Sequence, residues 1–123
     1  MDNRESAEMY LETVYVLSRK SDTVRKIDIS KHMGYAKPSV TRAVGLLEER
    51  GMITVDDSGN ILLTAKGKKE AQQIYERHTV LTKMFTALGV DEETATEDAC
   101  RIEHYISEKT FNAIKEHMEE YKK

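Results

Sequence analysis

The sequence predicts a mainly α-helical protein with a single small β-hairpin near its middle. Apolar residues recur every three or four positions over most of the chain, which is the pattern of amphipathic helices. Only residues 52–64 read instead as two short β-type runs around a turn. A chain of 123 residues forms one domain, or two small subdomains that share a core. Its 39% hydrophobic residues allow a core of moderate size, while its 33% charged residues imply a thin structure, often completed by an oligomer interface.

The first helix is expected over residues 5 to about 19. Its apolar positions are Met9, Leu11, Val14, Tyr15 and Leu17. Met9 and Glu12 lie three residues apart and therefore share a face of this helix. Taken alone, Met9 is most simply a core methionine, and Glu12 is most simply a surface carboxylate.

Two short helices are expected after a polar break at residues 20–24. The first covers residues 26–33 and ends at Gly34, which can adopt a left-handed conformation. The second opens at residues 36–39, where a proline in the first turn costs no hydrogen bond, and it runs to Gly51. Two short helices joined by a tight glycine turn, the second beginning with small polar and basic residues, indicate a helix-turn-helix.

A β-hairpin is expected directly after these helices. Its strands cover residues 52–55 and 61–64, and the loop between them is rich in turn-forming residues. A helix-turn-helix followed at once by a hairpin is a winged helix-turn-helix, so we expect residues 1–72 to form a DNA-binding domain of this kind. Asp56 and Asp57 stand at the wing tip where basic residues would help, so the wing should add little attraction for DNA.

The second short helix is the expected recognition helix. Ser39 and Arg42 should lie against base edges, because an arginine fork suits guanine. Lys37 and Thr41 should lie nearer phosphates. A contact of Arg42 with phosphate alone is an equal alternative. The predicted DNA-binding residues are Lys37, Pro38, Ser39, Thr41 and Arg42.

The C-terminal part of the chain predicts three further helices. A long helix over about residues 65–88 carries His78 in its middle and is shared between the two halves of the chain. A glycine ends it, and an N-cap carboxylate with acidic first-turn residues starts the next helix, which carries residues 100–104. Ser107 caps a final helix. Residues 73–123 are therefore expected to form a helical second domain.

Cys100, Glu103 and His104 would share one face of their helix, because residues three and four apart lie on the same side. Thiolate, carboxylate and imidazole groups all bind first-row transition metals. Short matches of this kind are common, and the alternative is a core cysteine beside a solvated Glu103–His104 pair. His78 alone is likewise most simply an interfacial histidine.

The net charge of −3 is unevenly distributed along the chain. Residues 1–75 hold 12 Lys and Arg against 11 Asp and Glu, whereas residues 76–123 hold 7 against 11. The acidic excess lies in the C-terminal part, which suits a first half that approaches phosphates. The single cysteine cannot form an internal disulfide, and neither a long apolar run nor a signal-peptide pattern occurs, so we expect a cytoplasmic protein without a membrane partner.

Four strings in the chain are similar to those of a known family. They lie at residues 8–15 (EMYLETVY), 37–41 (KPSVT), 63–67 (LTAKG) and 99–104 (ACRIEH). With the order of the elements, they make the chain resemble the diphtheria-toxin-repressor and manganese-transport-regulator family of bacterial metal-dependent transcription factors over nearly its whole length. The first and last strings together are specific, whereas the middle two occur in many winged helices.

The resemblance implies a metal site with ligands from the first helix, the long linking helix and the helix after it. The implied ligands are Met9, Glu12, His78, Cys100, Glu103 and His104. Thr82 and Thr96 stand where the iron-responsive branch has acidic and histidine ligands of a second site. A different second site is the alternative, with Glu12, His78, Glu103 and the shared Cys100 sulfur. The number of ions per chain, one or two, stays open.

The ligand types bear on which metal is bound. Met9 and Cys100 match the iron-responsive branch, whereas Glu12 and the lack of a third domain match the manganese-responsive branch. Thioether and thiolate donors are soft and favour Fe(II) over the harder Mn(II). We therefore expect Fe(II), with Mn(II) as the alternative.

The function implied by the resemblance is that of a metal-dependent transcriptional regulator, a repressor of metal-uptake genes. Residues 73–123 would serve metal binding and dimerisation, and the metal would fix the first helix against the linking helix and the helix after it. In a homodimer this would set the two recognition helices about one DNA turn, roughly 34 Å, apart on a pseudo-palindromic double-stranded operator. No small-molecule substrate is expected.

Two alternatives come from other classes of protein. In a winged-helix redox sensor, Cys100 would be a reactive thiol without a metal, and its oxidation would alter DNA binding in chelator. In a small metalloenzyme, His, Glu and Cys groups would activate water. The chain is short and spends about half its length on a DNA-binding module, so we do not expect an enzyme.

Overall fold

The structure is a computed structural model that describes residues 3–121. Over these residues the chain forms six helices and two strands. In chain order they are α1 (Asn3–Lys20), α2 (Lys26–Met33), α3 (Lys37–Glu49), β1 (Ile53–Val55), β2 (Ile61–Leu63), α4 (Ala65–Ala87), α5 (Glu92–Ile102) and α6 (Glu108–Tyr121). The chain divides into an N-terminal unit, Met1–Gln72, and a C-terminal unit, Gln73–Lys123, with the division inside α4. No helix in the described part of the chain is long and apolar enough to cross a bilayer.

The predicted fold class, mainly α-helical with a winged helix-turn-helix before a helical region, is confirmed. All elements occur in the predicted order, and their ends lie within two residues of the expected positions. The turn between α2 and α3 contains Gly34 at φ 73°, the left-handed conformation expected of it. α3 ends at Glu49, two residues before the expected Gly51.

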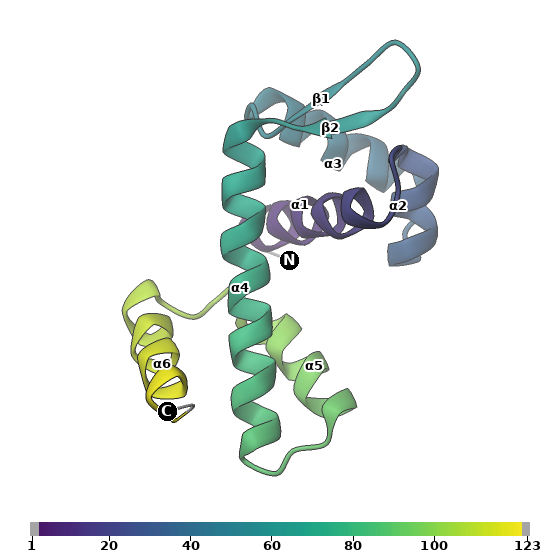
Figure 1. The fold of residues 1–123 in the computed structure, drawn as a ribbon. Helices are drawn as coiled ribbons and strands as arrows, with labels where there is room; N and C mark the ends of the chain where they lie inside the picture. The colour runs from purple at the N-terminus through teal and green to yellow at the C-terminus, as the bar shows by residue number, and fades with distance from the viewer. Residues whose placement is uncertain (1–2, 122–123) are drawn as a thin grey trace. The chain divides into compact units, whose positions relative to one another are not determined.

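The core of the N-terminal unit lies between α1, α2 and α3 (Figure 1). α1 buries one stripe, at the spacing expected of an amphipathic helix: Ala7, Tyr10, Leu11 and Val14. α2 and α3 contribute the buried side chains Ile29, Val40, Val44 and Leu47. Met9 and Glu12 lie off the buried stripe and are half-buried on the other side of α1. The face of α1 that carries the predicted ligands is thus separate from the face that supports α3.

The hairpin is joined to the helices by backbone hydrogen bonds. β1 pairs antiparallel with β2, with Ile53 opposite Leu63. The amide of Ile61 donates to the carbonyl of Val24 at 2.7 Å, and the amide of Val24 donates to the side chain of Asn60 at 3.0 Å. These bonds fix β2 against the segment between α1 and α2, so the wing and the helix-turn-helix form one unit.

The start of α4 packs closely on the start of the hairpin. The Thr64 hydroxyl donates to the carbonyl of Gly51 at 2.6 Å and accepts from the amide of Gly67 at 3.0 Å, so it caps α4. Gly67 is buried, and a Cβ atom at this position would overlap the backbone carbonyl of Met52. The absence of a side chain at Gly67 is therefore a condition of this packing.

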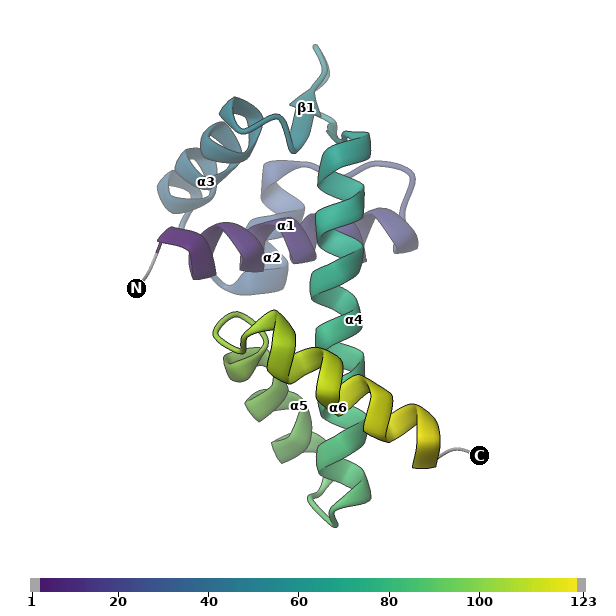
Figure 2. The ribbon, with the colours of Figure 1, turned by 90° about the vertical axis from the view of Figure 1, so that its left-hand side faces the viewer.

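The C-terminal unit is formed by the second half of α4 with α5 and α6 (Figures 1 and 2). Its apolar core includes Ile74 and Leu81 of α4, Ala95 and Ala99 of α5, and Phe111 of α6. Both shorter helices begin at side-chain caps. Asp91 accepts from the amide of Thr94 at 3.0 Å, and Ser107 accepts from the amide of Thr110 at 3.1 Å, as the sequence predicts.

Replacing Gly67 by alanine should destabilise the protein by about 1–3 kcal/mol, because the new methyl group must displace the Met52 carbonyl. Gly45 is the matched control: it also lies in a helix, α3, but nothing lies within 4 Å of a Cβ atom there. Gly45→Ala should be neutral or stabilise by up to about 1 kcal/mol, because alanine favours the helix. Urea unfolding followed by circular dichroism measures both, and a Gly67→Ala variant as stable as the wild type would contradict the packing described.

Candidate metal centre and DNA-binding surface

Three metal-ligating side chains meet in the C-terminal unit. His78 comes from the middle of α4, Cys100 from the last turn of α5, and Glu103 from the C-cap of α5. The Nδ1 atom of His78 lies 3.0 Å from Oε2 of Glu103 and 3.7 Å from Sγ of Cys100. One ligand atom from each residue lies within 4.8 Å of the others. The described residues thus bring an imidazole, a thiol and a carboxylate to one point.

The carboxylate of Glu103 lies between two imidazole rings. Its Oε2 atom faces His78, and its Oε1 atom lies 3.3 Å from Nε2 of His104. Glu103 is only 1% exposed and His104 only 4% exposed. A buried carboxylate requires hydrogen-bond donors or opposite charge around it, and these two rings can supply both.

Cys100 and Glu103 come together as their spacing of three residues predicts, because Glu103 keeps helical dihedral angles and its amide donates to the carbonyl of Ala99 at 2.9 Å. His104, which the same spacing places on that face, lies beyond the end of the helix. α5 ends at Ile102, so Glu103 is the C-cap and His104 lies in the following turn. The amides of Tyr105 and Ile106 both donate to the carbonyl of Ile102, at 2.9 and 3.0 Å, which closes the turn there. The turn, rather than helical spacing, brings His104 back to the second oxygen of Glu103.

The environment of His78 favours its protonated form. The hydrogen bond with Cys100 and then the hydrogen bond with Glu103 raise the pKa of His78 from 6.5 to about 10, against the opposing effect of partial burial. In the metal-free protein at neutral pH, the imidazolium of His78 therefore holds the carboxylate and the thiol together. Binding of a metal ion at Nδ1 requires this proton to leave.

The spacing of the donor atoms fits a single transition-metal ion. Ligand atoms bound at about 2.0–2.3 Å from one ion lie roughly 3–4 Å from each other. The separations of 3.0 Å and 3.7 Å around His78 Nδ1 fall in this range. The donor types, imidazole nitrogen, carboxylate oxygen and thiolate sulfur, are those that bind divalent first-row metals. The residues present therefore fit such an ion.

The other two predicted ligands, Met9 and Glu12, lie on α1 in the N-terminal unit. They are three residues apart, half-buried, and off the buried stripe of their helix. Of the six predicted ligands, His78, Cys100, Glu103 and His104 are therefore the four that the C-terminal unit brings together.

The predicted DNA-binding residues occupy the first turns of α3. Pro38 stands at the start of the helix, where its fixed φ suits the first turn. Lys37, Thr41 and Arg42 are exposed, and Ser39 is half-buried. Ser39 and Arg42 also line a hollow of about 310 Å³ beside α1. The N-terminal part of α3 thus presents small polar and basic side chains at the surface of its unit.

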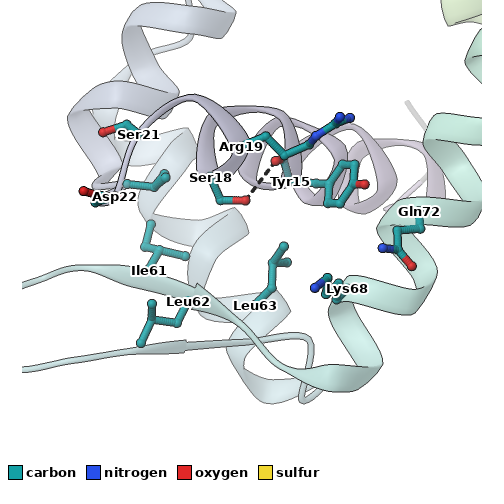
Figure 3. A pocket seen from close by; sticks show the side chains of 11 residues that line it. Tyr15, Ser18, Arg19, Ser21, Asp22, Ile61, Leu62, Leu63, Lys68 and Gln72 are labelled. Atoms are coloured by element: carbon teal, nitrogen blue, oxygen red, sulfur yellow. Dashed lines mark hydrogen bonds between the residues drawn. The ribbon is translucent and has the colours of Figure 1, made fainter.

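A larger groove of about 580 Å³ lies elsewhere in the N-terminal unit, between the end of α1, β2 and the first turns of α4 (Figure 3). Arg19 lies over the ring of Tyr15 at 5.6 Å, and the Ser18 hydroxyl donates to the carbonyl of Tyr15 at 2.8 Å. None of the predicted metal or DNA ligands lines this groove. It is therefore separate from both candidate sites.

Arg77 also contacts this site, although the sequence gives it no predicted role. Its Nη1 atom donates to the backbone carbonyls of Glu103 and Ile106, at 3.2 and 3.3 Å. The only signal in the sequence is its position directly before His78 in an acidic half of the chain. Every residue has a backbone carbonyl, so no sequence pattern predicts these contacts.

Two family comparisons cover most of the chain. Residues 3–59 match the family described as iron dependent repressor, N-terminal DNA binding domain. Residues 64–123 match the family described as iron dependent repressor, metal binding and dimerisation domain. The two matches fall on the winged helix-turn-helix and on the helices that carry the ligand cluster.

Similar whole proteins are named as regulators. The transcriptional regulator MntR of Escherichia coli O6:H1 is 33% identical over 112 residues, which cover 91% of this chain and 72% of the relative. An uncharacterised helix-turn-helix transcriptional regulator of Methanocaldococcus jannaschii is 31% identical and covers 96% of each chain. The solved structure of the manganese regulator SloR matches with a TM-score of 0.81 at 23% identity, over 97% of this chain and 55% of that chain. The chain thus spans about half the length of that solved regulator, whose likeness supports the fold.

The ring of His78 should remain protonated at pH 8 in the metal-free protein and titrate near pH 10. Because this pKa is above the ordinary value of 6.5, the ring's contribution to stability is fully present below pH 6.5 and is lost as the pH rises towards 10. Nuclear magnetic resonance of the imidazole, assigned with His78→Gln, measures the titration, and the same ring in denaturant is the control. A folded-state midpoint near 6.5 would contradict the hydrogen bonds described.

Proposed function

The chain belongs to the diphtheria-toxin-repressor and manganese-transport-regulator family of metal-dependent transcriptional regulators, which are not enzymes, and we propose that metal binding at its C-terminal ligand cluster tightens its binding to an operator DNA. The observation that carries the proposal is the approach of His78, Cys100 and Glu103 ligand atoms within 4.8 Å of one another. The same chain presents the start of α3 as a polar and basic surface.

His78, Cys100, Glu103 and His104 are the proposed ligands in the C-terminal unit. Glu103 offers two oxygens, each already directed at a histidine, so small adjustments would let it share an ion with either ring. Met9 and Glu12 are proposed as further ligands on the sequence resemblance alone. One ion would bind per chain if both Glu103 oxygens serve the same ion. Two ions would bind if each oxygen serves a different one.

We propose Mn(II) as the first ion to test and Fe(II) as the second. The expectation of Fe(II) rested on the soft sulfur donors of Met9 and Cys100. The solved SloR structure carries the name of a manganese regulator, whereas the family descriptions name iron. Three of the four C-terminal ligands are nitrogen or oxygen donors, which suits the harder Mn(II) ion.

Coupling between metal and DNA follows from linkage. Without metal, the negative charge of the Glu103 carboxylate is balanced by protonated His78. A bound divalent ion would supply this positive charge instead. If the DNA-competent arrangement of the chain holds its ligands in better geometry, metal binding raises its population. In the proposed homodimer, two copies of α3 would address two half-sites of a pseudo-palindromic operator, and the regulator would repress genes for metal uptake.

A redox sensor is the second candidate function, favoured by one observation. Cys100 is exposed, and its sulfur lies 3.7 Å from the imidazole of His78. A thiol beside a protonated histidine is a setting in which cysteines react with oxidants. In this case the protein would bind DNA equally well in chelator, and oxidation of Cys100 would change the affinity.

Anaerobic titration of a DNA fragment from the region upstream of its own gene should show binding at least tenfold tighter with Mn(II) than with chelator, about 1.4 kcal/mol of coupling. Glu103→Gln should abolish most of this gain, because the neutral amide removes the charge that both histidines face. Glu97→Gln is the matched control, since Glu97 is an exposed glutamate of α5, the helix that Glu103 caps.

The proposal fails if the wild type binds equally tightly in chelator, or if Glu103→Gln retains the full metal-dependent gain. The first result would favour the redox sensor. A gain with Fe(II) that exceeds the gain with Mn(II) would restore the expectation drawn from the sulfur donors.

Arg42→Ala should weaken binding to the best operator by about 1–3 kcal/mol and relax the preference at one base-pair position. The reason is that Arg42 is exposed in the first turns of α3, where an arginine fork can reach a guanine edge. Selection of bound sequences from a randomised DNA pool measures the preference for wild type and variant. Lys37→Ala is the control, which we expect to weaken binding uniformly across sequences.

A uniform loss for Arg42→Ala, with the salt slope of binding reduced by about one, would place Arg42 on a phosphate instead.

A further inference from the structure

Arg77 occupies a junction in the C-terminal unit, one residue before the proposed ligand His78. The residue is half-buried, and its guanidinium donates from Nη1 to the carbonyl of Glu103 at 3.2 Å and to the carbonyl of Ile106 at 3.3 Å. The same guanidinium lies 5.6 Å from the centre of the Phe111 ring of α6. One side chain of α4 thus contacts the end of α5, the turn after it and the next helix.

The two carbonyls belong to the turn that ends α5. Carbonyls at and beyond a helix C-terminus have no partner within the helix, so they must bond elsewhere. A cation placed there is favourable, because the helix dipole concentrates negative partial charge at that end. Arg77 supplies both the donor and the charge, and it holds the turn against α4.

Glu103 is therefore held twice by adjacent residues of α4. Arg77 binds its backbone carbonyl, and His78 binds its carboxylate oxygen Oε2. The backbone of a residue fixes where its side chain begins, so the first contact limits the positions that the carboxylate can reach. His104 follows directly in the same turn and depends on the same anchor.

We propose that Arg77 is a positioning residue for the metal site, which it serves by fixing the backbone of Glu103 and His104. This inference rests on the proposed function. Residues that orient metal ligands from outside the ligand set typically contribute about 10- to 100-fold in metal affinity. Arginine suits the position because its planar group can donate to two acceptors and stack on an aromatic ring, which the compact ammonium of lysine does less well.

The charge of Arg77 makes it possible to distinguish a positioning effect on metal affinity from an electrostatic one. A fixed positive charge near the cluster repels a metal ion, so its removal should tighten metal binding if charge were the main effect. Loss of positioning has the opposite sign and should weaken binding. Arg77→Lys keeps the charge and loses the planar fork, while Arg77→Met loses both and keeps the length of the side chain.

The experiment compares the wild type, Arg77→Lys, Arg77→Met and a control variant, Lys83→Met. Lys83 is an exposed cation of the same helix, so its replacement changes the net charge by the same amount as Arg77→Met. Circular dichroism first establishes that each variant is folded, and Arg77→Lys remains informative if Arg77→Met does not fold. Two measurements follow on the folded proteins.

The first measurement is amide hydrogen exchange in chelator, which needs no metal. The amides of Tyr105 and Ile106 both donate to the carbonyl of Ile102. In the Arg77 variants they should exchange at least tenfold faster than in the wild type, whereas in Lys83→Met their exchange rates should equal those of the wild type. The second is anaerobic Co(II) binding followed by absorption. Both Arg77 variants should bind Co(II) at least tenfold more weakly, with altered ligand-field bands, whereas Lys83→Met should match the wild type.

The inference is overturned if Co(II) affinity and spectrum are unchanged in the Arg77 variants, even with faster exchange, because Arg77 would then support the fold alone. It is also overturned if exchange in the turn is unchanged, or if Arg77→Met binds Co(II) more tightly. A wild type that binds no Co(II) contradicts the proposed function itself, and the exchange result then reports on the turn independently.

Discussion

The buried carboxylate of Glu103 is the constraint on which the C-terminal unit depends. A carboxylate that is 1% exposed is stable only if donors or positive charge surround it, and the chain supplies a histidine for each oxygen. This requires α4 to present His78 beside the end of α5 and the following turn to fold back so that His104 returns. The packing that surrounds the carboxylate is therefore the same arrangement that brings its Oε2 atom, the His78 ring and the Cys100 sulfur to one point. Folding and the proposed metal site share one set of contacts.

Much of the fold could be read from the sequence because single residues mark the ends of its elements. Gly34 takes the left-handed conformation at the turn, and Ser107 caps the last helix through its hydroxyl, as expected from their types. The close approach of Gly67 to the hairpin had no such signal, since it depends on a backbone carbonyl distant in the sequence. The end of α5 was likewise hidden: helical spacing predicts that Cys100 and Glu103 meet, as they do, but it also extends the helix to His104, which lies in the turn after Ile102. The family resemblance pointed to the residues that gather in this cluster, but nothing in the sequence pointed to the contacts of Arg77 with the backbone of the turn.

The distribution of charge agrees with a division of roles between the two units. The acidic excess falls in residues 76–123, where carboxylates can serve a cation, and the exposed first turns of α3 carry basic and small polar groups suited to DNA. The donor set is mixed, because the Cys100 thiolate favours softer ions and the oxygen and nitrogen donors accept harder ones. Such a set binds several divalent metals, so the ion that acts in the cell is decided by geometry and availability as well as by affinity. The family relation narrows the class of function to metal-dependent transcriptional regulators.

The most direct test of this account is X-ray absorption of the Mn(II)-loaded protein, compared with its Cys100→Ser variant. In the wild type we expect the metal to have nitrogen, oxygen and sulfur neighbours. In the variant the sulfur contribution should be lower, while the scattering from the imidazole rings should remain. A shell of oxygen alone, identical in the two proteins, would mean that the ion is bound elsewhere or loosely at the surface. That result would contradict the assignment of His78, Cys100 and Glu103 as a metal centre.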